Sequence, residues 1–600
     1  RCVENCPAGA VKLGQKLCTK DGFIEYPRQE LPDEVKWGPE KWAIDYRDKN
    51  RINCHDTGTA PCKTACPAHI AVQGYLKLAA QGKYREALQL IKRENPFPAV
   101  CGRICNRRCE DACTRGTVDQ AVAIDEVKRF IAQQDLDAAT RFVPEKVIPK
   151  VDGEFGEKIA VIGAGPAGMS CAFYLAEKGY RPTVFEKEER PGGMLMNGIP
   201  SFRLEKDVVE AEIDILREMG VEFRCGVEVG KDVTIAQLRE EGYQGFYVAV
   251  GLQSGGRLNI PGGEAQGVQA GIDFMRHVNS GLCSKMSGRV VVIGGGNIGA
   301  DVARTALRCG ADSVDLYCLE GYEDMPMGEE DRGECEREGI TIHAGWGQTE
   351  IVEQDGKCAG IRFRKCLSVK NAEGRFDPKF DDAVTEETAC DMVLYCIGQK
   401  VEWKALLTGT KVEFNPNGTV KADPVTYQTA EPDIFVGGDA YTGQKFAIDA
   451  IAAGKQGAVS LHRWVQHATL TIGRDRRQFI ELDKENALIA IDSYDNTPRQ
   501  QIGYNEALRK TFRDERIAFT EEQVKKETAR CLGCGASIVD PNKCIGCGIC
   551  TTKCAFDAIH LHRERPECST MYKCEDKMKA ILPYMIKRNF KIKRAARKSK

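Results

Sequence analysis

The sequence predicts an α/β protein built on two glycine-rich strand–turn–helix units, one nested inside the other, with a cysteine-rich domain on either side. Two observations support this fold class. Glycine-rich turns follow apolar strands near residues 163 and 294. The chain has 28 cysteines in 600 residues. Most of the cysteines whose spacing indicates a function are clustered outside these units. In a long chain with dinucleotide-binding units, clustered cysteines indicate metal ligation before disulfides.

The first unit, from Ile159 to Lys187, follows the order strand, turn, helix, strand. In its GxGxxG turn, Gly163 permits the tight bend, Gly165 lets a pyrophosphate approach the backbone, and Gly168 lets the helix pack closely on the strand. The helix then directs free N–H groups at the phosphates. Glu186 ends the second strand about 20 residues further on, where a carboxylate can bind ribose hydroxyls. A chance glycine-rich turn is the alternative.

A second unit has the same pattern, with an apolar strand followed by Gly294, Gly296 and Gly299. A strand that ends at Gly251 completes the first half of the outer domain. A later strand that ends at Gly398 completes the inserted domain. Two such units in one chain indicate one flavin and one nicotinamide nucleotide, which a single unit would not. We therefore expect two nested Rossmann-like domains that bind FAD and NAD(H) or NADP(H).

The second strand of the inserted domain ends in Glu320. A carboxylate at this place would repel a 2′-phosphate and accept hydrogen bonds from a 2′-OH, which favours NADH. In the alternative, Glu320 points to solvent and Arg304, Arg308 or Arg332 binds a 2′-phosphate. Neither glycine-rich turn is accompanied by the CxxC pair of a disulfide reductase, so electrons leaving a flavin would need iron–sulfur clusters.

Three cysteine fields predict such clusters. The spacing of Cys2 and Cys6 is typical of the end of a ferredoxin motif whose front half would precede residue 1, and stray cysteines in a coil are the alternative. The second field flanks helical periodicity at residues 70–93, so a helical hairpin would bring its two halves together. Buried free thiols or a zinc site are alternatives there. This field comprises Cys54, Cys62, Cys66, Cys101, Cys105, Cys109 and Cys113.

The third field, near the C-terminus, has the CxxCxxCxxxC spacing that is typical of a [4Fe–4S] ferredoxin, at Cys544, Cys547, Cys550 and Cys554. A second site there would draw on Cys531, Cys534, Cys568 and Cys574, although these do not repeat the motif. Zinc or free thiols are the alternative for that second set. The basic tail Lys587–Lys600 is expected to be solvated and partly irregular, or to dock on an acidic partner.

Several segments resemble one family. CKTACP, NPFPAVCGRICNRRCEDAC, AVAIDEVKRF and GGMLMNGIPSFRLEKDVV are similar to the glutamate synthase small-subunit family, which includes the N-terminal half of dihydropyrimidine dehydrogenase and the large subunit of electron-bifurcating transhydrogenase. The resemblance covers residues about 50–465. It implies that Cys54, Cys62 and Cys113 serve one [4Fe–4S] cluster, and that Cys66, Cys105 and Cys109 serve another.

The chain departs from that family at two ligand positions. Thr57 stands near the place of a further cysteine, and Lys128 stands where some relatives have Gln or Glu. A protonated lysine cannot ligate iron, so Cys101 or His55 would have to fill one vacancy. More often, a histidine at such a place is an ordinary loop residue.

The segment Glu431–Val459 resembles the family's second flavin motif. Asp439 would hold hydroxyls of the flavin side chain, and a helix start near Ile448–Ile451 would direct N–H groups at the isoalloxazine. An ordinary aspartate helix cap is the alternative. No catalytic side chain is predicted. Together these motifs predict cofactor contacts at Gly163, Gly165, Pro166, Ala167, Gly168, Glu186, Lys187, Gly193, Arg203, Gly251, Gly294, Gly296, Asn297, Gly299, Glu320, Gly398, Gly438, Asp439, Ala450 and Ile451.

The predicted domain order follows from these motifs. We expect a ferredoxin-like remnant with a linker (1–50), a helical [4Fe–4S] domain (51–150), the first part of the FAD domain (151–284), the NAD(P) domain (285–397), the second part of the FAD domain (398–470), a linker or helical segment (471–530) and a ferredoxin-like [4Fe–4S] domain with the basic tail (531–600).

Composition narrows the function further. The net charge of −2 and the lack of a long apolar run favour neither nucleic-acid binding nor a membrane span. The clustered cysteines favour a reducing cytoplasm. Together, the motifs, the resemblance and the cysteine fields on both flanks predict an NAD(P)H oxidoreductase subunit that exchanges electrons with ferredoxin or with flavin and iron–sulfur partners in a hetero-oligomer, as in an electron-bifurcating transhydrogenase. The alternatives are the small subunit of a glutamate synthase and a non-catalytic iron–sulfur scaffold.

Overall fold

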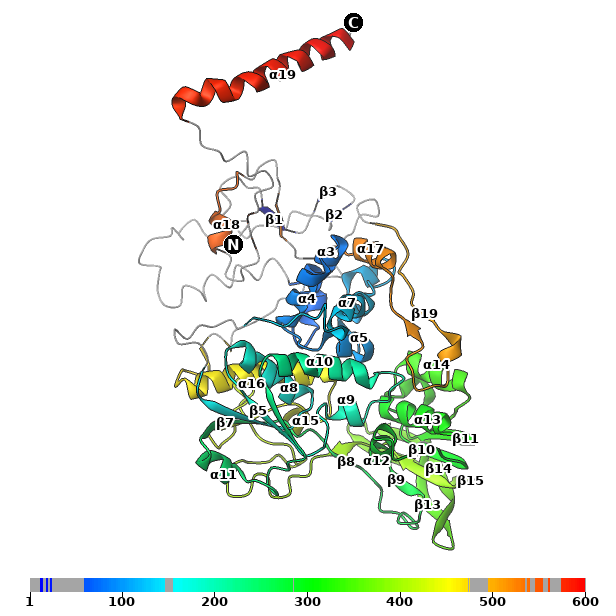
Figure 1. Ribbon diagram of the computed structural model, residues 1–600. Coiled ribbons are helices and arrows are strands. Elements are labelled where there is room, and N and C mark those ends of the chain that lie inside the picture. The colour runs from blue at the N-terminus through cyan, green and yellow to red at the C-terminus, as the bar shows by residue number, and fades with distance from the viewer. Residues whose placement is uncertain are drawn as a thin grey trace. The chain divides into compact units, whose positions relative to one another are not determined.

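The computed structural model describes residues 59–145, 155–472 except 284, 474, 495–534, and shorter stretches at 11–13, 18–19, 22–23, 537–539, 545–553, 559, 561 and 573–598. The chain forms two compact units, which are described separately. His55–Ala536 belongs to the larger unit, and Ser537–Lys600 to the smaller one. Figure 1 shows the described elements.

The outer Rossmann-like sheet of the larger unit has five parallel strands in the order β18-β7-β4-β5-β6. Apart from the edge strand β6, almost all of their side chains are buried, because helices cover both faces. The strands are β4 (Lys158–Ile162), β5 (Thr183–Glu186), β6 (Glu222–Cys225), β7 (Tyr243–Val248) and β18 (Ile434–Val436). β18 pairs directly with β7 although the whole inserted domain separates them in sequence, which confirms the nested arrangement.

The inserted domain has its own parallel sheet, ordered β12-β11-β10-β16-β9. Its strands are β9 (Val268–Ala270), β10 (Arg289–Ile293), β11 (Ser313–Cys318), β12 (Thr341–Ala344) and β16 (Met392–Tyr395). The helices α12 (Gly271–Asn279), α13 (Asn297–Cys309) and α14 (Glu329–Glu338) belong to this domain. Both predicted units are therefore present as Rossmann-like folds.

A three-stranded antiparallel sheet, not predicted from the sequence, follows within the inserted domain. It consists of β13 (Trp346–Gln354), β14 (Lys357–Lys370) and β15 (Phe376–Thr388). Gln354 pairs with Lys357, so Asp355 and Gly356 form a two-residue turn, with φ of 52° and 77°. Asp-Gly is the strongest short signal of such a hairpin, so the sequence did contain a usable indication.

The cysteine-rich domain is helical, and its predicted hairpin at residues 70–93 is confirmed by α3 (Val72–Ala80) and α4 (Tyr84–Lys92). The shorter elements around it carry the cysteines. These are α2 (Pro61–Thr64), α5 (Pro98–Ile104), α6 (Arg108–Asp111), the 3₁₀ turn Thr114–Thr117 and α7 (Ile124–Ala132).

A strap of residues 495–534 begins and ends against the cysteine-rich domain and reaches the inserted domain in between (Figure 1). It contains β19 (Gly503–Tyr504), β20 (Arg516–Ile517) and α17 (Glu521–Ala529). Arg516 donates hydrogen bonds to the carbonyls of Arg103 and Arg203, both at 3.0 Å. This part of the predicted linker is therefore attached on both sides.

The smaller unit pairs the two ends of the chain. β1 (Val11–Leu13) is antiparallel to β21 (Ser537–Val539), and α18 (Ile549–Lys553) follows the second of them. The described part of the basic tail, up to Lys598, lies in α19 (Lys577–Lys598), which is a helix. Among the described residues, no helix combines the length and the apolar character needed to cross a bilayer.

Two long helices of the outer domain, α8 (Pro166–Glu177) and α16 (Ala447–Val465), pack backbone to backbone. A Cβ at Gly454 would lie 2.2 Å from the carbonyl oxygen of Ala167 and 2.9 Å from the amide of Cys171. Since both neighbours are main-chain atoms, neither can move aside like a flexible side chain. The first turn of α8 thus depends on a glycine in α16.

We expect Gly454→Ala to destabilise the larger unit by about 1–3 kcal/mol, because the added methyl forces the two helices apart. The check is the urea midpoint of the holoprotein, followed by flavin release. Gly333→Ala, in α14, is the matched control, since its Cβ would approach only the end of the Arg337 side chain, at 3.7 Å. This control should be neutral or stabilising, because alanine replaces glycine inside a helix. Equal midpoints for both variants would contradict this account of the packing.

Candidate cofactor-binding site

One cavity of about 1080 Å³ extends between the two Rossmann-like domains and reaches both glycine-rich turns. Most of the predicted contact residues line it. They are Gly163, Gly165, Pro166, Ala167, Glu186, Lys187, Gly193, Arg203, Gly251, Gly294, Gly296, Asn297, Glu320, Gly398, Gly438, Asp439 and Ala450. Gly168, Gly299 and Ile451 do not line it.

The first and third glycines of each turn are required by close backbone packing. A Cβ at Gly163 would lie 2.5 Å from the carbonyl oxygen of Ala249, and one at Gly294 would lie 2.4 Å from that of Cys396. At the third position, a Cβ at Gly168 would lie 1.9 Å from the oxygen of Gly163, and the equivalent distance at Gly299 is 2.1 Å. The third glycines therefore act by helix–strand packing without facing the cavity.

The second glycines are different, because a Cβ at Gly165 or Gly296 would meet no protein atom within 4 Å. Both line the cavity and precede the first residue of a helix, α8 or α13, that has no side-chain cap. The open space and the uncapped N–H groups together fit a pyrophosphate at each turn. These residues thus fit two dinucleotides.

Glu186 is fixed beneath the first turn. Its carboxylate accepts hydrogen bonds from the amides of Ala164, at 2.8 Å, and Glu188, at 3.0 Å. Burial raises the pKa of Glu186 although these bonds oppose the shift. Each oxygen has a second lone pair, so the position is compatible with ribose hydroxyls as further partners.

The second flavin motif differs from its prediction in detail. α16 begins at Ala447, after Phe446, and both residues line the cavity. Ile451 is fully buried instead, and its carbonyl accepts a hydrogen bond from the Ser170 hydroxyl at 2.7 Å. Asp439 lines the cavity, and burial raises its pKa to about 6. The uncapped start of α16 therefore faces the cavity at Ala447, one residue before the predicted range Ile448–Ile451, and Ala450 lines the cavity as predicted.

Arg203 lies between the two nucleotide-binding domains. It forms ion pairs with Asp301 on α13 and Asp331 on α14, and it lines the cavity together with Asp301. Burial alone would lower the pKa of Arg203, but these two carboxylates raise it well above its usual range. Arg203 thus joins the two domains across the cavity, and its charge is already paired there. No local pattern in the sequence indicates Asp301 as the partner of Arg203.

The three arginines considered for a 2′-phosphate all have other partners. Arg304 and Arg308 form buried ion pairs with Glu338, and Arg304 also pairs with Glu334. Arg332 pairs with Glu323 and donates to the carbonyl of Tyr322. Glu320, in contrast, lines the cavity.

The cysteines of the helical domain form two groups. In the first, Lys128 lies among Cys101, Cys105 and Cys109, and forms a buried ion pair with Asp125. Burial alone would lower the pKa of Lys128, but the Asp125 carboxylate raises it well above its usual value. The Lys128 ammonium group is thus paired with a carboxylate in this arrangement. Cys66 lies near Cys105.

Cys62 and Cys113 form a second group, apart from the first and next to Cys531 and Cys534. Cys547 in the smaller unit is exposed and Cys550 half-buried. Within the described part of the chain, no three Cys, His, Asp or Glu side chains lie close enough to hold a single metal ion. The other predicted ligands lie outside the residues whose side chains are described: Cys2, Cys6, Cys54, Cys544, Cys554, Cys568 and Cys574.

The cysteine-rich domain contacts the cavity directly. Ile104, at the end of α5 and next to Cys105, lines it. Arg108 forms a two-point ion pair with Asp449 in the first turn of α16, with both N–O distances 3.1 Å, and lies over the Phe446 ring. A group of thiols is thus fixed beside the flavin end of the cavity. Sequence reasoning did not single out Ile104 and Phe446, because each is an apolar residue between the glycine, aspartate or cysteine positions that mark its motif.

Comparisons with known proteins agree with this site. Residues 157–456 match the model of the pyridine nucleotide-disulphide oxidoreductase family, residues 45–140 the 4Fe-4S domain II of dihydropyrimidine dehydrogenase, and residues 537–560 a 4Fe-4S binding domain. The chain is 33% identical to the NADP(+)-dependent formate dehydrogenase subunit beta of Moorella thermoacetica, over 79% of this chain and 70% of that protein.

Two further relatives match the chain at similar identity and over a similar share of its length. The NADPH-Fe(3+) oxidoreductase subunit beta of Geobacter sulfurreducens is 28% identical over 80% of this chain and 75% of its own. The NADPH glutamate synthase small chain of Escherichia coli is 31% identical over 69% of this chain and 90% of its own. With two dinucleotide turns on one cavity and cysteines beside it, the chain belongs to the glutamate synthase small-chain family of NAD(P)H-dependent oxidoreductases, which use FAD and [4Fe–4S] clusters.

Proposed function

We propose that this chain is the electron-transfer subunit of a larger complex, and that it passes electrons between NAD(P)H and ferredoxin or partner subunits through FAD and iron–sulfur clusters. The observation that carries this proposal is the place of Ile104. This residue lines the dinucleotide cavity, and the next residue is a cysteine of the first thiol group. When bound, the flavin supplies the conversion between a hydride and single electrons.

The chain's own residues position the cofactors. The second glycines leave room for the two pyrophosphates, and the uncapped helices α8 and α13 direct N–H groups at them. The N-terminus of α16 supplies a positive partial charge that favours negative charge on a reduced ring. Arg203 keeps the two domains in contact across the cavity.

Anaerobic titration of the holoprotein with NADH or NADPH tests this function. We expect the flavin absorbance to fall first and the iron–sulfur absorbance to follow, because the nucleotide site opens on the same cavity as the flavin site. Reduction of both by substoichiometric nucleotide would support electron transfer within the chain. A bound flavin that neither nucleotide reduces would favour the scaffold alternative.

We further propose that the complex is of the electron-bifurcating transhydrogenase type and works in the cytoplasm with ferredoxin. Cysteine fields on both flanks of the flavin domains support a route to more than one partner. Three relatives are named as subunits or chains, which supports a hetero-oligomer. Identifying the co-purified subunits, and measuring NADH-dependent ferredoxin reduction by the complex, tests this assignment.

A glutamate synthase-type complex is the second candidate, because the chain spans 90% of the E. coli small chain. In that case, addition of a glutamate synthase large subunit would give NAD(P)H-dependent glutamate formation from glutamine and 2-oxoglutarate. Ferredoxin reduction without glutamate formation would favour the first candidate.

We also propose that the chain prefers NADH. Glu320 lines the cavity, whereas Arg304 and Arg308 are engaged in buried ion pairs. A carboxylate at this place accepts hydrogen bonds from a 2′-OH and repels a 2′-phosphate.

The variant Glu320→Ser should therefore raise kcat/KM for NADPH relative to NADH by about tenfold, which corresponds to about 1.4 kcal/mol. Steady-state reduction of an artificial acceptor with each nucleotide measures this ratio. Glu373→Ser, in the exposed turn between β14 and β15, is the matched control and should leave the ratio unchanged. The preference is refuted if the wild-type chain favours NADPH and Glu320→Ser does not alter the ratio.

A further inference from the structure

A cysteine pair at the end of the strap, Cys531 and Cys534, lies against the helical cysteine-rich domain. From sequence alone, both thiols are expected to belong to the ferredoxin-like domain. In the structure, however, they belong to the larger unit, which ends at Ala536. α17 leads into the pair and packs against α3 and α7. Leu532, between the two thiols, is buried. The pair is therefore part of the helical domain's fold.

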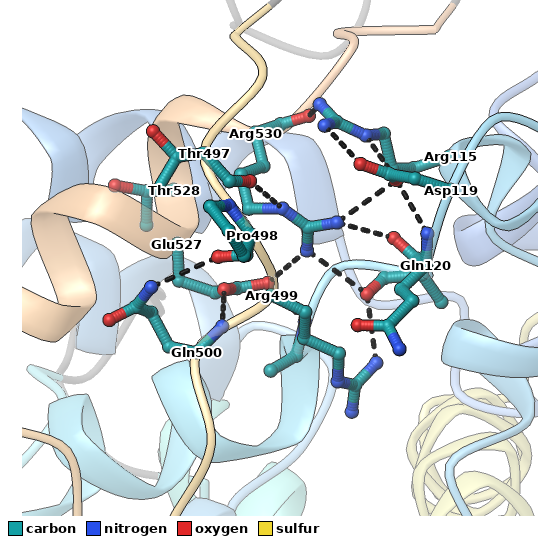
Figure 2. Close-up of polar contacts among 12 residues, drawn as sticks. Arg115, Asp119, Gln120, Thr497, Pro498, Arg499, Gln500, Glu527, Thr528 and Arg530 are labelled. Atoms are coloured by element: carbon teal, nitrogen blue, oxygen red, sulfur yellow. Dashed lines mark hydrogen bonds and ion pairs between the residues drawn. The ribbon is translucent and has the colours of Figure 1, made fainter.

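A buried arginine fixes the start of this pair. Arg530 is fully buried, and all five of its N–H donors have acceptors (Figure 2). Asp119 and Glu527 each accept one of these hydrogen bonds, at 3.0 and 2.7 Å. The other three go to the carbonyls of Thr497, Gln120 and Ala121. Removing such a partner from a buried charge network is costly, so the position of residue 531 is strongly determined.

Side chains of the cysteine-rich domain bind both ends of the cysteine pair. Arg115, two residues after Cys113, is also buried and donates to the carbonyl of Arg530 at 2.9 Å. At the far end of the pair, Gln73 on α3 donates to the carbonyl of Cys534 at 2.5 Å. Residues more than 400 positions apart thus hold both ends of the cysteine pair.

Four thiols lie near one another at this place. Cys62 lies in α2, which packs on α6, and Cys113 follows α6 by two residues. Cys113, Cys531 and Cys534 are the neighbouring thiols of Cys62. Cys534 in turn has Cys531 and Cys113 beside it, and is itself buried. Four cysteine thiols are the usual ligand set of a [4Fe–4S] cluster.

We propose that Cys62, Cys113, Cys531 and Cys534 together ligate one [4Fe–4S] cluster. The N-terminal domain then supplies two ligands, and the C-terminal strap supplies the two that it lacks. This set explains the departure noted at Thr57, where the resembling family has a cysteine. It also replaces Cys54 as a ligand, and it separates Cys531 and Cys534 from the ferredoxin-like set.

Iron and acid-labile sulfide counts on anaerobically purified full-length protein test the ligand set. We expect Cys531→Ala and Cys62→Ala each to lose about four irons per chain, and the double variant to lose no more than either. Combining Cys531→Ala with Cys547→Ala should instead remove about eight irons, because two clusters are then lost. Cys54→Ala is the matched control and should keep all of its iron.

The opposite pattern would overturn the proposal. If Cys531 served the ferredoxin-like domain, the combination with Cys547→Ala would lose about four irons and the combination with Cys62→Ala about eight. Loss of about four irons in Cys54→Ala, or one zinc per chain with iron unchanged in Cys531→Ala, would also contradict it. Flavin reduction by NADH, recorded on the same samples, does not depend on which thiols bind iron. A failure of the proposed function is therefore distinguishable from a failure of this ligand assignment.

A measurement on the unaltered holoprotein covers variants that do not fold. Under alkylation with iodoacetamide, the four thiols should be protected together and become reactive together as a chelator removes iron. Mass spectrometry of the peptides would record this. Release of Cys531 and Cys534 together with Cys547 and Cys550, while Cys62 and Cys113 stay protected, would contradict the proposed set.

Discussion

The arrangement depends on how firmly the helical cysteine-rich domain is attached to the outer flavin domain. Glu212, on α10 (Lys206–Glu218), is fully buried and accepts hydrogen bonds from the amides of Ala99 and Val100, at 2.8 and 2.9 Å. These amides begin α5, the helix that ends beside the cavity. A carboxylate at a helix N-terminus satisfies free donors and complements the helix dipole. Burial nevertheless raises the pKa of Glu212 to about 8, although the hydrogen bonds from Ala99 and Val100 oppose the shift.

This attachment matters because electrons pass only between centres that are close together. Glu212 fixes the start of α5. Arg108, the first residue of α6, attaches the next helix to the first turn of α16 through its ion pair with Asp449. Between them, Ile104 meets the cavity and Cys105 meets the first thiol group. The same few contacts therefore serve the fold and the electron path.

Local patterns predicted much of this structure. Each glycine-rich turn is one short stretch in which spacing and chemistry lie together, so the sequence alone indicates that Gly163 and Gly294 follow a strand and precede a helix. Asp355 and Gly356 are an equally local signal for the antiparallel sheet. The sheet is nevertheless not predicted here, because the surrounding strands are largely exposed on one side.

Contacts between residues far apart in the chain could not be predicted from the sequence. Nothing near Cys531 indicates that Arg115 holds its peptide group, since the two residues are separated by most of the chain. The partners of Arg203, Arg304 and Arg308 are likewise set by the packing of α13 on α14. Whether an arginine is available to a phosphate is decided by those tertiary ion pairs, which spacing along the chain does not encode.

The most direct measurement of the central claim is the rate of electron transfer from flavin to clusters after rapid mixing with NADH, over a range of protein concentrations. Transfer within one chain predicts a rate that is independent of protein concentration and needs no added mediator. A rate that rises in proportion to protein concentration, or clusters that stay oxidised beside a reduced flavin, would contradict the account.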